Sequence, residues 1–153
     1  MSDDHHNTVE YLEHLYENAS CPVPPRTHYW AMALVPLYLY GHLDKAVEVG
    51  TEIIDGVCHL WSLRVSFVLY FYLSLAILCR HFDNPTQYPL GSQLDDVLKY
   101  KAEIDYARSC CDANYAMWSL LLEALLSEIS GDFPKSVQAF EVGQSRDLRL
   151  PLS

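Results

Sequence analysis

The nearly continuous apolar run VSFVLYFYLSLAILC, residues 65–79, constrains the fold of this chain more than any other feature, and it lies between Arg64 and Arg80. As a helix it would be about 22 Å long, at about 1.5 Å per residue, whereas a bilayer core of about 30 Å needs about 20 residues. The three aromatic residues 70–72 lie at its centre, although membrane spans carry such rings at their ends. The run therefore predicts a helix buried between neighbouring helices, and a single membrane span is the alternative.

The rest of the chain repeats apolar residues at helical spacing, without the sustained alternation that is typical of strands. We therefore expect an all-α fold of about six to seven helices, over about residues 7–18, 27–41, 43–54, 60–81, 93–110, 114–130 and 132–145. Pro36 is expected to kink the helix that contains it. Two helices have predicted periodic faces: Leu94, Val97, Leu98, Lys101, Ile104, Ala107 and Arg108 in one, and Met117, Leu121, Ala124, Leu125 and Glu128 in the other.

Charge and proline content divide the chain into unequal parts. The formal net charge is −10, and residues 1–20 hold five acidic residues and no basic one. The segment CPVPP at 21–25 ends any helix, because proline removes a donor and biases the preceding residue to an extended backbone. We expect an acidic leader with a short helix and a Pro-rich linker at 1–26, a helical-repeat domain at 27–147 and a frayed tail at 148–153.

The same acidic balance bears on partners and location. Nucleic-acid binding depends on Lys and Arg that neutralise phosphates, so a nucleic-acid partner is not expected. The five cysteines show no disulfide spacing, and the acidic N-terminus has no apolar signal segment. These features predict reduced thiols in a cytoplasmic protein.

Two segments repeat one turn pattern: a glycine, a large apolar residue two positions later and a small residue five positions later. They are Gly41, Leu43 and Ala46 in the first copy, and Gly131, Phe133 and Ser136 in the second. Glycine allows a tight turn between two helices. The apolar residue is expected to plug the turn, and the small residue to let the two helices approach closely. A connection this short joins antiparallel helices.

This pattern resembles tetratricopeptide repeats, which are 34-residue helix pairs that carry a large aromatic residue where Trp30 lies, 16 residues before Ala46. The resemblance implies stacked antiparallel hairpins, an α-solenoid, at about 28–57, 60–110 and 114–145. The middle pair departs from the pattern, since its helices are long and its loop is about ten residues. Gly50 and Gly143 also replace residues that these repeats usually carry on the second helix.

A narrower resemblance rests on YLYGHLDKAVEVGTEII, FVLYFYLSLAIL and LLLEALLSEISGDFPKSVQAFEVG, within residues 38–143. These segments are similar to the helical-repeat region of large fungal hybrid histidine kinases, although the motifs are mainly helix-packing motifs. The resemblance implies a connecting or sensing scaffold in a phosphorelay protein, with kinase activity in other domains. The chain would then be a fragment, a truncated gene product or a free-standing relative.

Residues capable of metal or redox chemistry occur without the spacing that such chemistry needs. Cys58-His59 and Cys79-x-His81 lack zinc-ligand spacing, and a helix separates them. His5-His6 is expected to be a solvated tail rather than a loose metal site. Cys110-Cys111 lies near both Arg108 and acidic residues, so a redox role is not expected.

Catalytic motifs are also missing from the sequence. Glu123 and Glu128 are five residues apart on a predicted helix, so they project about 140° apart and do not form an acid–base pair. Nucleophile-elbow, phosphate-loop and metalloprotease motifs do not occur. We expect no enzyme, no cofactor and no metal.

The aromatic content gives the best functional hint, with 11 Tyr and 3 Trp. Tyr29, Trp30, Tyr38 and Tyr40 are candidates to line a partner-binding groove, because such rings offer large area with few rotors; core packing is the alternative. We expect a non-catalytic scaffold that contacts a protein partner or a neighbouring domain in signal transduction. A small-molecule or lipid sensor with a pocket beside helix 60–81 is the second hypothesis, and a membrane-associated protein is the third.

Overall fold

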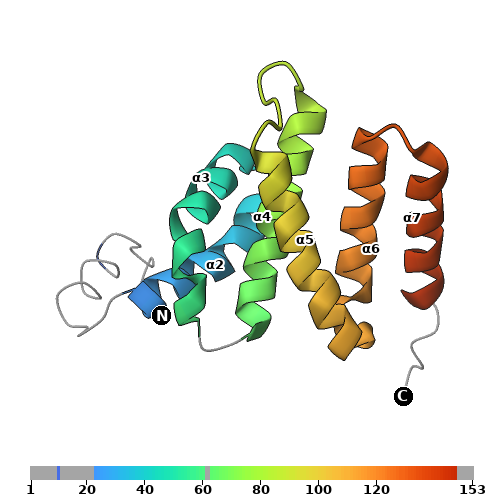
Figure 1. The fold of residues 1–153 in the computed structure, drawn as a ribbon. Helices are drawn as coiled ribbons and strands as arrows, with labels where there is room; N and C mark the ends of the chain where they lie inside the picture. The colour runs from blue at the N-terminus through green and yellow to red at the C-terminus, as the bar shows by residue number, and fades with distance from the viewer. Residues whose placement is uncertain (1–9, 11–22, 61–62, 148–153) are drawn as a thin grey trace, which may run out of the picture.

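The computed structural model describes residues 10, 23–60 and 63–147 (Figure 1). Its elements are α2 (Val23–Leu39), α3 (Leu43–Ile53), the short 3-10 helix η1 (Ile54–His59), α4 (Leu63–Asp83), α5 (Gln93–Cys110), α6 (Asp112–Ile129) and α7 (Phe133–Asp147). The part of the chain that the structure describes contains no strand, which confirms the all-α prediction. The predicted helix at 7–18 (apart from Glu10), His5-His6 and the tail at 148–153 lie outside the described residues.

The helices pack in chain order, each against the next. Figure 1 shows α2 and α3 on one side of α4, with α5, α6 and α7 following on the other. Helix α4 contacts α2, α3 and α5 extensively and α6 less so, whereas α7 packs against α6 and has no other comparable contact with the described helices. The two ends of the array are therefore covered unequally.

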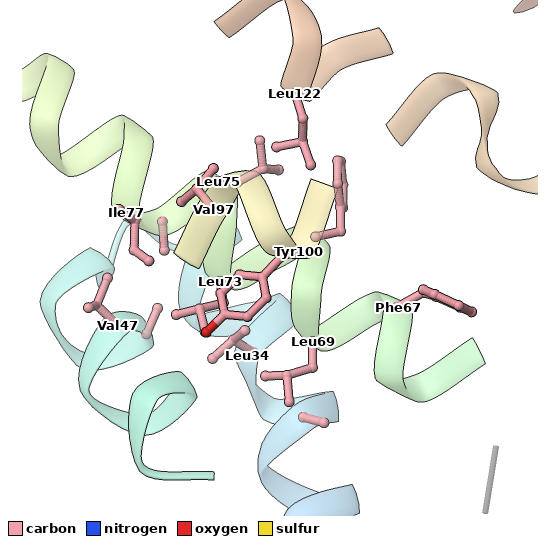
Figure 2. Packing of buried hydrophobic residues seen from close by; sticks show 14 of the residues in the cluster. Leu34, Val47, Phe67, Leu69, Leu73, Leu75, Ile77, Val97, Tyr100 and Leu122 are labelled. Atoms are coloured by element: carbon pink, nitrogen blue, oxygen red, sulfur yellow. The ribbon is translucent and has the colours of Figure 1, made fainter. Parts of the chain in front are cut away.

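Helix α4 forms the centre of the core, as its apolar sequence predicts. Leu69, Leu73, Ala76 and Leu78 are at most 1% exposed, and Figure 2 shows core side chains from α2 to α6 converging around this helix. The segment Arg64–Asp83 also has the length and composition to cross a membrane, and 56% of its most apolar window is buried in this fold. Core helices of folded proteins share these properties.

The two repeated turns have the same backbone geometry. Gly41 and Gly131 both have φ of 77°, which is the left-handed region that glycine enters without steric cost. In each turn the glycine amide donates to the carbonyl three residues before it, and the following amide donates to the carbonyl five residues before it, at 2.8–3.0 Å. This is the Schellman arrangement that ends a helix.

The residues around these turns differ in their burial. Ala46 and Ser136 are buried between their helices, and Leu43 packs against the core, as predicted. The prediction for Phe133 is wrong, because its side chain is 62% exposed rather than a plug of the turn. Leu43 and Phe133 differ in burial because α4 packs on α3, whereas no described helix follows α7 and packs on it in the same way.

Several predicted boundaries also shift. Helix α2 begins at Val23 rather than at residue 27, so the predicted Pro-rich linker ends too late. Pro24 and Pro25 fall in its first turn, where a missing amide donor costs nothing. The helix runs through Pro36 and ends at Leu39. Helix α5 has the predicted limits, and α6 begins two residues earlier than expected.

Candidate functional site

The four aromatic candidates, three on α2 and Tyr40 in the turn after it, do not line one groove. Trp30 and Tyr38 pack against the core, and the Tyr38 hydroxyl lies 3.6 Å from Cys79 Sγ. Tyr29 lies in a shallow hollow at the N-terminal part of α2, and its ring meets that of Trp30 edge-on, with centroids 5.2 Å apart. Tyr40 is 80% exposed at the end of the hairpin. Two of the residues thus belong to the core side of α2, and the other two lie in the shallow hollow and in the turn.

An exposed apolar face lies instead on α7. Phe133, Val137 and Phe140 are 62%, 55% and 39% exposed. Their spacing of four and three residues places them on one face of the helix. The side of α7 that packs against α6 carries small residues, and there Ser136 and Ala139 are buried. Small side chains let α7 lie close to α6, so the large side chains of α7 point away from the hairpin.

In the first copy of the turn pattern, the corresponding face of α3 is buried. Counted from the turn glycine, Val47 in α3 corresponds to Val137 in α7. Val47 is 5% exposed and Val137 is 55% exposed. The difference follows from α4, which packs on α3 and has no counterpart on α7 among the described helices. Two copies of one local pattern therefore present one filled and one open surface.

Two hollows lie between neighbouring helices. One, of about 550 Å³, is lined by α5, α6 and the start of α7, and the ion pair of Lys135 with Glu123, at 3.1 Å, links α7 to α6 there. The other, of about 460 Å³, lies between α3 with η1 on one side and α5 on the other, with α4 as its floor. We call the second hollow the α3–α5 cleft.

The α3–α5 cleft contains the residues that sequence reasoning missed. Tyr70 and Tyr100 line it, and their rings stack with centroids 5.2 Å apart and planes at 10°. Burial raises the pKa of Tyr100 to about 12, and the negative charges of Asp96 and Asp55 add to the effect. Burial also raises the pKa of Tyr70, with Glu103 contributing. The spacing of Tyr100 between Val97 and Ile104 is the helical signal that could have identified it.

The metal and thiol candidates remain apart. Among the described residues, no group of three or more His, Cys, Asp or Glu side chains could hold a metal ion. Cys58, Cys110 and Cys111 are exposed free thiols, and Cys79 is half-buried beside Tyr38.

The two carboxylates of α6 do not share a site. Glu123 is half-buried and pairs with Lys135, whereas Glu128 is exposed and does not line the hollow that contains Glu123. The structure therefore gives them no common cleft for acid–base chemistry.

No family model, curated protein or solved structure matches this chain. Its function is therefore argued from the geometry of its own surfaces.

Proposed function

We propose that this chain is a non-catalytic scaffold of stacked helical hairpins, similar to tetratricopeptide-type solenoids, that binds a partner helix on the outer face of α7. The observation that carries the proposal is the contrast between Val47, 5% exposed, and Val137, 55% exposed, at equivalent places in the two copies of the turn pattern. A row of large apolar side chains on one helix face is a common docking surface for an amphipathic helix.

The first copy indicates why the occupant should be a helix. There, α4 packs so closely on α3 that a Cβ added at Gly50 would lie 2.6 Å from Leu73 Cδ1. The equivalent residue of α7 is Phe140, which is large and 39% exposed. The partner of α7 therefore needs a small residue opposite Phe140, with apolar neighbours that contact Phe133 and Val137. At this contact the partner therefore differs from α4: α4 places the large Leu73 against the small Gly50, whereas the partner places a small residue against the large Phe140.

The size of this surface favours reversible binding. Complete burial of a large apolar side chain contributes about 1.5–3 kcal/mol. Three such residues must offset an association cost of about 4–15 kcal/mol. The partner helix belongs to another protein or to a neighbouring domain of a longer chain. A setting in signal transduction rests on the resemblance to the helical-repeat region of fungal hybrid histidine kinases.

Photo-cross-linking tests the proposal in the cells that express the protein. A photoreactive phenylalanine analogue replaces Val137 in one variant and Tyr106 in a control variant. Tyr106 is an aromatic residue on α5 that is 70% exposed and distant in sequence from α7. A synthetic peptide that covers the cross-linked site of the captured partner is then titrated with the purified chain.

We expect the variant at 137, and not the variant at 106, to capture one partner, whose peptide gains helical circular dichroism on binding. Val137→Asp should weaken peptide binding at least about tenfold, because a carboxylate in an apolar contact must be desolvated, while Tyr106→Asp should not change it. Capture of only a second copy of this chain, or of the same proteins at both positions, would overturn the proposal.

A further inference from the structure

Cys110 and Cys111 are adjacent at the junction of α5 and α6, and both are exposed free thiols. Cys110 is the last residue of α5, and Cys111 stands at the N-cap of α6 without a side-chain hydrogen bond to the helix. The Cys110 Sγ has only a long contact of 3.9 Å with Ser109 Oγ. The fold therefore leaves both sulfur atoms accessible to a reagent in solution.

The backbone changes direction between the two cysteines. The Cys111 amide donates to the Ala107 carbonyl at 2.9 Å, so the chain is helical through Cys110. Cys111 leaves the helical region, with φ of −149° and ψ of 81°. A helical residue followed by one with the φ of an extended strand is the pattern of a type VIII turn.

This turn brings the two Cβ atoms to the same side of the peptide plane between them. A helical ψ of about −42° at Cys110 places its Cβ well out of that plane, and the φ of −149° places the Cβ of Cys111 on the same side. In a strand the two Cβ atoms point to opposite faces, and in a continuous helix the second Cβ lies close to the plane. Small backbone rotations then bring the pair within the separation of a disulfide, between about 3.5 and 4.5 Å.

We propose that Cys110 and Cys111 are a reversible oxidation site, at which a low-molecular-weight disulfide converts the two thiols into a disulfide between adjacent residues. One thiolate attacks a sulfur atom of the small disulfide and displaces the first small thiol. The other cysteine then attacks the mixed disulfide and displaces the second. Two protons and two electrons pass from the protein to the small disulfide, which leaves as two thiols. The charges beside the pair in the sequence do not indicate this role, whereas the turn does.

The expected bond is a switch rather than a permanent crosslink. It closes an eight-membered ring around one peptide bond, so it is more strained than a disulfide between distant cysteines. Strained and exposed disulfides are readily reduced. The ring fixes ψ of Cys110 and φ of Cys111, the two torsions at the junction between α5 and the α6–α7 hairpin. The site does not rest on the partner face proposed for α7, so each proposal can fail without the other.

The test is a redox titration of the whole chain in mixtures of reduced and oxidised glutathione, followed by alkylation of the remaining thiols, digestion with trypsin and mass spectrometry. Cleavage after Arg108 and Lys135 releases peptide 109–135, in which Cys110 and Cys111 are the only cysteines. Its disulfide form is lighter by two hydrogen atoms and carries neither alkyl label nor glutathione.

Two controls separate the turn from general thiol reactivity. Cys58 is exposed, has no cysteine beside it in the sequence and falls in the separate peptide 46–64. It is the internal control, and it should yield only the thiol or a mixed disulfide with glutathione. The second control is the same titration of the urea-unfolded chain, where the cysteines remain adjacent but the turn is lost.

We expect the equilibrium constant for disulfide formation at Cys110 and Cys111 to be at least about tenfold larger in the folded chain than in the urea-unfolded chain, because only the fold holds the two Cβ atoms together. Circular dichroism should stay unchanged on oxidation, and in Cys110→Ser the remaining Cys111 should form only the mixed disulfide. An equal or smaller constant in the folded chain, glutathione on both cysteines without ring closure, or a loss of helical signal on oxidation would overturn the proposal.

Discussion

Arg80 shows how one side chain fixes a long connection. The loop between α4 and α5 has few apolar residues of its own, and Arg80 holds it from the end of α4. Its guanidinium lies 4.5 Å from the centre of the Tyr88 ring and forms an ion pair of 3.3 Å with Asp44 at the start of α3. The Tyr88 hydroxyl donates to the same carboxylate at 3.3 Å. The loop is predictable from its prolines and glycine, but this three-way contact is not, because Asp44 is 36 residues from Arg80 and 44 residues from Tyr88 in the sequence.

The buried tyrosines predict a loss of stability at alkaline pH. Burial raises the pKa of Tyr100 to about 12 from its usual 10.0, so an unfolded chain releases this proton at lower pH than the folded one. The contribution to stability is complete below pH 10 and is lost as pH rises through the folded pKa of about 12. Urea denaturation between pH 9 and pH 12 should therefore show a falling midpoint.

Tyr100→Phe should reduce that fall, because phenylalanine carries no titrating group. Tyr40→Phe is the matched control, since Tyr40 is 80% exposed, and it should leave the pH dependence as in the parent chain. A fall of the same size in the Tyr100→Phe variant would contradict the role assigned to this buried phenol.

At the scale of elements, the local sequence predicts the helix limits and turns that depend on local backbone preferences. The limits of α5 follow from its helical periodicity, and the turns at Gly41 and Gly131 follow from the left-handed backbone that glycine permits. The start of α2 differs from the prediction because Pro24 and Pro25 belong to the first turn of the helix, where proline is common, and not to a linker.

Buried faces were less predictable where a helix has neighbours on two sides. Helix α6 lies between α5 and α7, so it buries small residues such as Ala116 and Ser127 as well as leucines. The predicted stripe placed Met117 and Glu128 inside, but Met117 is 38% exposed and Glu128 is exposed. A single apolar stripe is expected of a helix that is covered on one face. A helix that is covered on two faces buries residues outside any single stripe, so its buried residues are harder to predict from periodicity.

The two interior glycines of α3 and α7 give opposite predictions for the same substitution. Gly50→Ala should destabilise the fold by about 1–3 kcal/mol, because the new methyl group would lie 2.6 Å from Leu73 Cδ1 in the core. Gly143→Ala should stabilise it by about 0.5–1 kcal/mol, because its Cβ meets only Met117, at 3.7–3.8 Å, and alanine favours the helix. Guanidinium denaturation of the two variants checks both signs. Equal effects would show that α3 and α4 do not approach as closely as described.

At the scale of the whole molecule, the exposed face of α7 and the α3–α5 cleft could not be predicted from the sequence, because they depend on how helices that are distant in sequence pack against one another. The turn pattern is the same around Gly41 and Gly131, so the local sequence predicts the same burial for the residues of both copies. Only the packing of α4 on α3 buries Val47 and leaves Val137 open. The α3–α5 cleft likewise joins Asp55 and Tyr100, which are remote in sequence and meet only across α4.

The open face of α7 is tested most directly by urea denaturation of the paired variants Val47→Thr and Val137→Thr, which make one isosteric change at equivalent places. Val47→Thr should lower the free energy of unfolding by about 1–2 kcal/mol, because a hydroxyl replaces a methyl group in the core. Val137→Thr should change it by less than about 0.5 kcal/mol, as surface substitutions do. A similar loss in both variants would mean that another part of the chain, or a second copy, already covers α7, and would contradict an open partner-binding face.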